Sequence, residues 1–414
     1  MKFKKIIIPI LLILVLVIFN KVFLTSFIKA NSYFASQSLY NNETVQPQKL
    51  FDKTWKIISN DYYDSSLNNQ NWSRWKNHYQ GKIKTDEDAR IAIETMIASL
   101  DEPYTRFLTP KDFEELTTSI SSRIYGIGVN IYSNSGKIEI FNVIPSTPAD
   151  FAQIKQGDII IAIDGKETNG MNVSEVANLV RGPENSVVEL TLLRGNKKII
   201  KKIKRKEIVI KNVKSSILNN HIGYIQILSF MGTTTPSEFM EALENTKKAD
   251  SLIIDLRGNT GGLLDNAVFI ANLFIKNGDI VKIIYRNGYK KIISATPTEE
   301  SLDKPVVILV NGASASASEI FSGALKDYNR ATLVGKKTFG KGLVQKVVPL
   351  PNKSGVNITI ARYLTPKDSD INKLGIKPDV EIGNEFDFFL NNSKKDIQLE
   401  KAEEILEKKC ENRL

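Results

Sequence analysis

The feature that most constrains the fold of this chain is an alternation of apolar runs and helical stretches between Ile217 and Ile382. The runs are short, and each lies near a stretch with helical spacing, such as "SEFMEALENTKKA" or "SEIFSGALKDY". Alternation of this kind is typical of a parallel sheet covered by helices. We therefore predict an α/β layer with a largely parallel sheet, built on the runs "HIGYIQIL", "SLIIDLR", "KPVVILV" and "ATLVG".

A second pattern, that of a compact β-rich module, extends from about Ile120 to Arg205. One helical stretch, "NVSEVANLV", opens on Asn172, which we expect to cap it. The dense basic run from Lys197 to Lys206 alternates with isoleucine, which favours a strand with one solvated face over a nucleic-acid site. No nucleic-acid partner is therefore expected. Strands are predicted at "GVNIY", "KIEIFNV", "DIIIAIDG", "SVVELTLL" and "KIIKKIKR".

The N-terminus has the layout of an export signal. A basic leader precedes fourteen unbroken apolar residues, Ile6 to Phe19, as in a secretory signal peptide or a signal anchor. No clear A-x-A cleavage site follows, which favours an uncleaved membrane anchor. We therefore expect export to the extracytoplasmic face of a bacterial cell envelope. The single cysteine, Cys410, excludes an internal disulfide and a cysteine-based metal cluster.

A polar tether and a helical region are expected between the leader and the β-rich module. Residues 31–48 are rich in Asn, Gln and Ser. The stretches "LFDKTWKIISNDYYD" and "DEDARIAIETMIASL" then carry apolar residues at helical spacing, and the second opens with an acidic first turn. Pro103 in "LDEPYTRFL" interrupts this pattern.

The chemistry centres on residues 311–320, "NGASASASEI", which place three serines at alternate positions. They lie between a predicted strand and a predicted helix, where backbone N–H groups are unpaired and the helix dipole favours negative charge. A serine there has donors nearby for a developing oxyanion. Small residues that only permit tight packing are the alternative explanation of such a run.

A nucleophilic serine needs a base, and the two histidines, His78 and His221, are poorly placed for that role. Lysine serves as the base in Ser-Lys enzymes. Its amine must lose about 3 pKa units from a model value near 10.4, which burial against apolar walls can supply. The candidate is Lys341 in "TFGKGLVQ", where two flanking glycines let the backbone bend.

Residues 335–342, "GKKTFGKG", also come close to a phosphate-binding loop. Gly342 stands where that loop needs Ser or Thr, and a strand-like run follows where it needs a helix, so we set this interpretation aside.

A glycine-rich turn, "DLRGNTGG", follows the run "SLIID" and exposes further N–H donors. It is either a plain connecting loop or a second wall of a pocket at the C-terminal edge of the sheet.

Taken together, these segments resemble the carboxyl-terminal processing peptidases, or tail-specific proteases, a serine peptidase family with an inserted PDZ domain. The resemblance covers about Leu50 to Ile382. It is carried, in the family's order, by "LDEPYTRFL", "YGIGV", "LVRGP", "IGYIQI", "DLRGNTGG", "SASASEI", "FGKGLVQ" and "GIKPDV". One departure is "YLTPKDSDINK", which lacks the glycine usual after Thr-Pro.

The resemblance assigns catalytic roles residue by residue. Ser316 is the implied nucleophile, and Lys341, 25 residues later, is the implied general base. Gln345 would orient the lysine. Residues four apart in a strand are separated by about 13 Å, so we expect either a bend at Gly342 or a helical turn there. The implied oxyanion donors are the N–H groups of Ala317 and Gly262.

The resemblance also implies peptide capture by the PDZ module. Gly126, Ile127 and Gly128 of "YGIGV" would bind a substrate C-terminus, the next strand would pair with the peptide, and Arg181 of "LVRGP" would couple capture to the protease site. Implied substrates are polypeptides with accessible, preferably apolar C-termini. The expected reaction needs no cofactor and no metal. An adaptor protein, the membrane through the N-terminal segment, and a homo-oligomer are compatible partners.

The predicted fold class is mixed α/β: a protease core with crotonase-like β/α layers, an inserted β-rich PDZ domain and an N-terminal helical region. An inactive PDZ-bearing tether and an acyl-CoA enzyme with the same core are the rival hypotheses. The first would not need to retain Ser316, Lys341 and Gln345 together, and the second would not need a peptide-binding module. The predicted segments are 1–30 (signal peptide or membrane anchor), 31–49 (linker), 50–117 (N-terminal helical region), 118–208 (PDZ domain), 209–385 (serine protease core) and 386–414 (C-terminal helix or tail).

Overall fold

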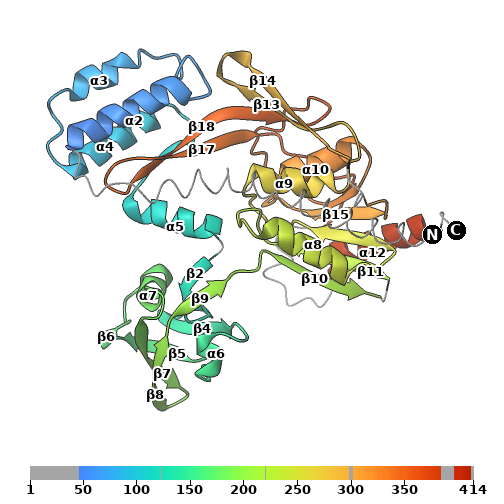
Figure 1. Ribbon diagram of the computed structural model, residues 1–414, viewed down its shortest axis with the longest axis horizontal. Coiled ribbons are helices and arrows are strands. Elements are labelled where there is room, and N and C mark those ends of the chain that lie inside the picture. Colours follow the sequence, from blue (N-terminus) through green and yellow to red (C-terminus); the bar gives the residue numbers. More distant parts are fainter. Residues whose placement is uncertain (1–45, 122, 220, 298–301, 384–395, 412–414) are drawn as a thin grey trace, which may run out of the picture. The chain divides into compact units, whose positions relative to one another are not determined.

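The computed structural model describes residues 46–121, 123–219, 221–297, 302–383 and 396–411 (Figure 1). The predicted leader, and the predicted linker up to residue 45, lie outside these residues. Within the described part, no helix has the length and apolar character needed to cross a membrane. The chain divides into two compact units, Met1–Phe113 with Val344–Ala361, and Glu114–Leu343 with Arg362–Leu414, which we describe in turn.

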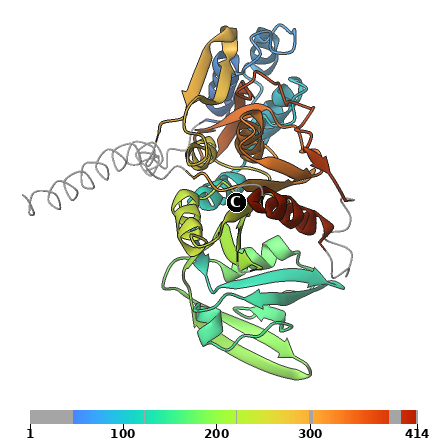
Figure 2. The ribbon, with the colours of Figure 1, turned by 90° about the vertical axis from the view of Figure 1, so that its right-hand side faces the viewer.

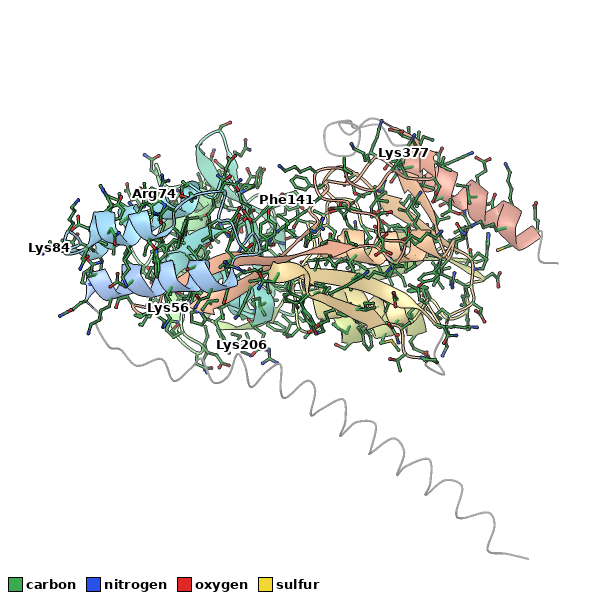
Figure 3. All side chains as sticks on the ribbon, turned by 90° about the horizontal axis from the view of Figure 1, so that it is seen from above. Lys56, Arg74, Lys84, Phe141, Lys206 and Lys377 are labelled. Atoms are coloured by element: carbon green, nitrogen blue, oxygen red, sulfur yellow. The ribbon has the colours of Figure 1, made fainter. Side chains whose placement is uncertain are left out.

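The first unit contains the helices predicted after the leader. Helix α4 begins at a capping box, in which the Thr85 hydroxyl accepts the Asp88 N–H and the Asp88 carboxylate accepts the Thr85 N–H. Exposed basic side chains such as Lys56, Arg74 and Lys84 project from this unit (Figure 3). Both predicted helices are confirmed, and the full set is α2 (Pro47–Asp61), α3 (Ser73–Tyr79) and α4 (Asp86–Ala98).

Two strands from far along the chain complete this unit. Strand β18 (Gly355–Leu364) pairs with β17 (Leu343–Pro349) and, antiparallel, with the short β1 (Arg106–Leu108). Buried side chains of this returning segment share one core with the helices. The sequence pattern of the N-terminal region did not reveal this partnership. The shared core includes Leu350, Val356 and Ile358 together with Phe51, Ile58, Ile93 and Met96.

The β-rich module of the second unit follows helix α5 (Pro110–Ser121) and is a sheet of order β3-β4-β5-β7-β8, with β6 paired to β5. Its helix α7 (Val173–Val180) is capped by Asn172 as predicted, because the Asn172 side chain accepts the Glu175 N–H. All five predicted strands are confirmed. They are β3 (Val129–Asn134), β4 (Lys137–Val143), β5 (Ile159–Ile163), β7 (Val187–Arg194) and β8 (Lys197–Lys204), with β6 at Lys166–Glu167, α6 at Pro148–Phe151 and a separate pair β2 (Arg123–Gly126) with β9 (Lys206–Val209).

The rest of the second unit is built on a six-stranded sheet of order β10-β11-β12-β15-β16-β19. Strands β11, β12, β15, β16 and β19 are parallel, and β10 is antiparallel at one edge. Every residue of β12 and β15 is buried, as expected for central parallel strands covered on both faces. The predicted parallel α/β layer is therefore confirmed. The bounds are β10 (Val213–Leu218), β11 (Ile222–Ile227), β12 (Ser251–Asp255), β15 (Val306–Val310), β16 (Thr332–Gly335) and β19 (Val380–Glu381).

Helices cover both faces of this sheet. On one face lies the C-terminal helix α12 (Ile397–Glu411), whose Ala402 and Leu406 pack on Ile253 and Val307. On the other, Phe239 and Phe321 contact Phe274. Figure 2 shows α12 and α8 on opposite sides of the sheet. The helices of the second face are α8 (Thr235–Asn245), α9 (Leu264–Asn272) and α10 (Ala317–Asp327), and the hairpin β13 (Asp279–Tyr285) and β14 (Lys290–Ser294) follows α9.

One ion pair secures the β-rich module and can be tested directly. Asp158 is buried, and Arg194 donates to both of its oxygens at 2.7 Å. Burial opposes ionisation of Asp158, but hydrogen bonds from Arg194 and the Lys155 N–H outweigh it and lower the pKa of the carboxyl. We expect Asp158→Asn to lower the free energy of unfolding by about 2 kcal/mol at pH 7, because the partly exposed guanidinium of Arg194 loses its buried charge partner.

The stabilisation from Asp158 should also depend on pH. Because its folded-state pKa is lowered, the contribution is present at neutral pH and is lost as the pH falls from the unfolded value of about 3.9 through the folded one. Urea unfolding of the wild type and of Asp158→Asn should therefore converge at low pH. Glu189→Gln, which breaks the exposed contact with Lys202, is the matched control, with an expected change below about 0.5 kcal/mol. A difference in the free energy of unfolding between the wild type and Asp158→Asn that persists at low pH would contradict this account.

Candidate active site

The turn between β15 and α10 (Figure 1) carries three serines, and their environments differ. The Ser314 hydroxyl donates to the Leu256 carbonyl at 2.8 Å, and the Ser318 hydroxyl donates to the Asn259 carbonyl at 2.9 Å. Both side chains are fully buried. Ser316 is partly exposed and is the N-cap of α10. Two hydroxyls thus tie the turn to the neighbouring loop, and the third is not used for that purpose.

Ser316 has a strained backbone. Its φ is 54° and its ψ is −114°, a combination that costs a non-glycine residue about 1–3 kcal/mol and persists only where the surroundings enforce it. The Ser316 N–H donates to Glu319, and the Ser316 carbonyl accepts the N–H groups of Glu319 and Ile320. Strain of this kind concentrates at functional sites.

The glycine-rich turn after β12 meets the serine turn. Strands β12 and β15 are parallel neighbours, so their C-terminal ends lie at one edge of the sheet, as predicted. The Ala315 N–H donates to the Asn259 carbonyl at 3.0 Å. A Cβ atom built on Gly261 would lie 2.9 Å from the Ala317 nitrogen and 2.7 Å from the Ala315 oxygen. Only glycine permits this approach, so the turn is more than a connecting loop.

The two N–H groups expected to face an oxyanion are available for that task. Gly261 donates its N–H to the Asn259 side chain, whereas within the described residues the N–H groups of Gly262 and Ala317 have no acceptor. Ala317 is the first residue of α10, where the helix dipole is positive. Both groups could therefore donate to an anion.

Lys341 lies in the loop between β16 and β17 and is half buried. The loop is fixed to the serine turn, since the Phe339 N–H donates to the Ser314 carbonyl at 3.0 Å. Gly340, with φ 90°, and Gly342 both pack closely against residues 372–375, where a Cβ atom would meet backbone nitrogens at 2.8 Å. Packing thus requires glycine on either side of the lysine, and backbone conformation also requires it at Gly340.

A buried carboxylate joins the nucleophile turn to the lysine loop. Glu319 Oε2 accepts the N–H groups of Ser316 and Lys341, both at 2.9 Å. Glu319 Oε1 accepts the Gly340 N–H at 2.7 Å and the Thr338 hydroxyl at 2.5 Å. Burial raises the pKa of the Glu319 carboxyl, and the four hydrogen bonds oppose the rise. Two nitrogens that are each 2.9 Å from one oxygen lie within twice that distance of each other, so the Ser316 and Lys341 nitrogens are at most 5.8 Å apart.

A second side chain joins the same two residues. The Tyr363 hydroxyl lies 2.6 Å from the Lys341 carbonyl oxygen and 3.0 Å from that of Ser316, and Tyr363 is buried. Sequence analysis assigned no role to Glu319 or Tyr363. The S-x-x-E spacing of Ser316 and Glu319, a capping-box signature, was a usable signal for the first. No local signal pointed to the tyrosine.

Gln345 lies in the first unit, in strand β17. Its amide donates to the Thr359 hydroxyl at 3.3 Å, and that hydroxyl donates to Glu102 at 2.8 Å. Glu102 of "LDEPYTRFL" also accepts from Thr105. Of the two alternatives expected at Gly342, the helical turn is wrong, because strand β17 begins at Leu343, and the bend stays a prediction.

The loop predicted to bind a C-terminus has free backbone donors. Within the described residues, the N–H groups of Ile127 and Gly128 have no acceptor, whereas their carbonyls accept the N–H groups of Ala149 and Ile144. Gly128 has φ 88°, and a Cβ atom there would lie 2.3 Å from Thr147. Gly126 ends strand β2. The next strand, β3, is an edge of its sheet and so can accept a further strand.

Two arginines lie at the C-terminal end of α7. Arg181 is its exposed C-cap residue. Arg205, which sequence analysis missed, is buried and donates to the carbonyls of Leu179 and Val180 at 2.9 and 2.8 Å. A cation on the last carbonyls of a helix offsets its dipole. Arg205 therefore fixes the end of α7 beside Arg181.

No cluster of three or more metal-ligating side chains is present among the residues that the structure describes.

Comparison with known proteins places these features in a family. A family described as "Peptidase family S41" matches residues 221–382, and one described as "PDZ domain" matches residues 139–194. The "Carboxyl-terminal-processing protease" of Synechocystis sp. is 35% identical over 373 residues, which is 87% of each chain. The "Carboxy-terminal processing protease CtpA" of Bacillus subtilis is 38% identical over 364 residues, 86% of this chain and 73% of that one.

A solved structure supports the same assignment. The "Photosystem II D1 C-terminal processing protease" shares 32% sequence identity and superposes with a TM-score of 0.55, over 82% of this chain and 94% of that chain. The predicted fold class, a mixed α/β protease core with a PDZ domain and N-terminal helices, is confirmed.

The close approach of the two turns can be tested through stability. Gly261→Ala should lower the free energy of unfolding by about 3 kcal/mol or more, because φ 104° is unfavourable for alanine and its Cβ would overlap the Ala315 oxygen. Gly258→Ala in the same turn is the matched control. Its φ is 77°, but a Cβ there meets nothing within 4 Å, so only about 1 kcal/mol should be lost. If urea unfolding shows that both variants lose the same free energy of unfolding, the contact between the turns contributes nothing to stability.

Proposed function

Because the chain belongs to peptidase family S41, the carboxyl-terminal processing proteases, we propose that it cleaves exported proteins near their C-termini by a serine–lysine mechanism. The observation that carries the proposal is the proximity of the Ser316 and Lys341 backbones, at most 5.8 Å apart at their nitrogens. Ser316 is also the serine of the turn whose hydroxyl is not used to tie the turn to the neighbouring loop.

The chemistry follows from these positions. The neutral amine of Lys341 takes the proton of the Ser316 hydroxyl as the oxygen attacks the scissile carbonyl. The N–H groups of Ala317 and Gly262 donate to the developing oxyanion. The lysine then returns the proton to the leaving amine, and water attacks the acyl-enzyme with the same base. Gln345 keeps the role that the family resemblance gives it, orienting the lysine.

Substrate capture is proposed to occur in the PDZ domain. The free N–H groups of Ile127 and Gly128, together with that of Gly126, bind the substrate's terminal carboxylate, and the peptide adds to the edge strand β3. Arg181, exposed at the end of α7, couples capture to cleavage. Polypeptides with accessible, apolar C-termini are the proposed substrates. We place the enzyme on the extracytoplasmic face of the bacterial envelope, held by its N-terminal segment.

The catalytic assignment predicts the behaviour of two variants. Ser316→Ala and Lys341→Ala should each lower the cleavage rate of an unstructured protein with an apolar C-terminus by about 10,000-fold or more, because each removes one half of a cooperating pair. Wild-type activity should rise with pH as the lysine loses its proton. Mass spectrometry of the cleaved ends measures the cleavage rates of the variants and the pH dependence of the wild type. Cleavage that persists in Ser316→Ala would refute the assignment, and Ser237→Ala, at an exposed serine of α8, is the control substitution.

The capture proposal makes a separate prediction. A peptide with a free C-terminus should bind about 10- to 100-fold more tightly than the same peptide with a C-terminal amide, because hydrogen bonds to a charged acceptor are stronger. Isothermal titration with the Ser316→Ala protein, which cannot consume the peptide, measures the difference. Equal affinities would mean that the loop at residues 126–128 does not recognise a carboxylate.

A further inference from the structure

We propose that Glu319 and Tyr363 are positioning residues that fix the backbone of the base to the backbone of the nucleophile. The proposal rests on the serine–lysine function proposed above. Both side chains are buried, and neither transfers a proton in the reaction. Their role is to keep the Ser316 hydroxyl and the Lys341 amine within reach of each other.

The first connection is the Glu319 carboxylate. A single oxygen, Oε2, accepts the N–H of Ser316 and the N–H of Lys341, so a shift of either residue breaks one of the two bonds. The other oxygen holds Gly340 and Thr338 of the lysine loop. A carboxylate offers about four lone-pair sites, and four donors occupy them. The loop is therefore anchored at three of its residues to the helix that begins at the nucleophile.

The second connection lies on the carbonyl side of the same residues. The Tyr363 hydroxyl is within hydrogen-bond distance of the carbonyl oxygens of Lys341 and Ser316, and its single proton serves one of them at a time. Glu319 thus acts on the two N–H groups and Tyr363 on the two carbonyls. Together they hold both ends of each residue, which defines position and rotation.

Packing alone does not account for a carboxylate at this place. Glu319 is fully buried in α10, between Ser318 and the apolar Ile320. Among the described residues, no basic side chain pairs with it. Its four partners are neutral donors. An apolar side chain would avoid the desolvation cost of this anion. A carboxylate is useful here because it can accept several N–H groups that converge from two segments of the chain.

Loss of the hydrogen bond from Ser316 to Glu319 should change the conformation of the nucleophile, because the Ser316 backbone is strained. Without the Glu319 oxygen, the Ser316 N–H loses its acceptor and the residue can relax from φ 54°. The hydroxyl then turns away from the base. A displacement of about 1 Å at a reacting group costs about 100-fold in rate, so the effect on catalysis should far exceed any effect on folding.

Three variants separate positioning from general stability. Glu319→Ala removes all four bonds, and Tyr363→Phe removes one hydroxyl without leaving a cavity. Thr246→Val is the matched control, because it removes a buried hydroxyl that donates to the Ala242 carbonyl in α8 and leaves all four bonds to Glu319 intact. Each full-length variant is compared with wild type and Ser316→Ala. The measurements are thermal unfolding, cleavage of a peptide with an apolar C-terminus, and the rate at which a fluorophosphonate labels the serine across pH.

The expected order of effects is specific. Serine labelling should slow by about 100-fold in Glu319→Ala and about tenfold in Tyr363→Phe, and should stay within about twofold of wild type in Thr246→Val. The peptide KM should change little, since capture occurs elsewhere, so the loss falls on kcat. The midpoint of the labelling pH profile should move in Tyr363→Phe, because the base has been displaced. A variant that is merely less folded keeps the wild-type midpoint.

The outcomes distinguish this proposal from the one on which it rests. Labelling that requires Ser316 but proceeds at the wild-type rate in folded Glu319→Ala would overturn the positioning role of Glu319. If Glu319→Ala does not fold, Tyr363→Phe decides: wild-type kcat and an unmoved midpoint would overturn the proposal. A loss in Thr246→Val equal to that in Glu319→Ala would also overturn it, because the loss of any buried polar contact would then have the same effect. Labelling of Ser316→Ala at the wild-type rate would overturn the proposed function itself, and the positioning roles with it.

Discussion

The site depends on one buried carboxylate that has no basic partner among the described residues. Glu319 accepts hydrogen bonds from Ser316, Thr338, Gly340 and Lys341, so an anion in the core is stabilised entirely by neutral donors. Its position at the third residue of α10 is what allows this, because the first turn of a helix faces back toward the N-cap. The strained Ser316 backbone and the conformation of the lysine loop both follow from that single group.

The order of the strands in the sheet is the second feature on which the site depends. Parallel neighbours β12 and β15 end at the same edge, so the turn that carries the serine and the glycine-rich turn are brought together by strand order alone. Hydrogen bonds from Ser314 and Ser318 to carbonyls of the neighbouring turn then fix their separation. Gly261 allows an approach that any side chain would block. The serines on either side of the proposed nucleophile are thus structural, and the alternation of serine and alanine reflects this division of roles.

The returning strands divide the motifs that carry the family resemblance between two units. The segment Val344–Ala361 leaves the protease core and completes the hydrophobic core of the helical unit, where Gln345 and "LDEPYTRFL" share one hydrogen-bond network through Thr359. Lys341, only four residues before Gln345, stays with the serine turn. The chain therefore passes from one unit to the other immediately after the proposed base.

Sequence alone determined the parallel-sheet strands, the strands of the β-rich module, two N-terminal helices, the order of the motifs and the identity of the candidate nucleophile and base. Apolar periodicity, the cap at Asn172, and glycine-rich turns are local signals, so they can be read without a fold. Tertiary structure decided which groups hold the site together. Tyr363 and Arg205 act across long sequence separations, and Glu319 joins residues of two loops; such partners are chosen by packing, which leaves no local pattern. The same reason explains why the strands of the helical unit were missed: their partners lie some 250 residues away, as in the pairing of Phe107 with Val356.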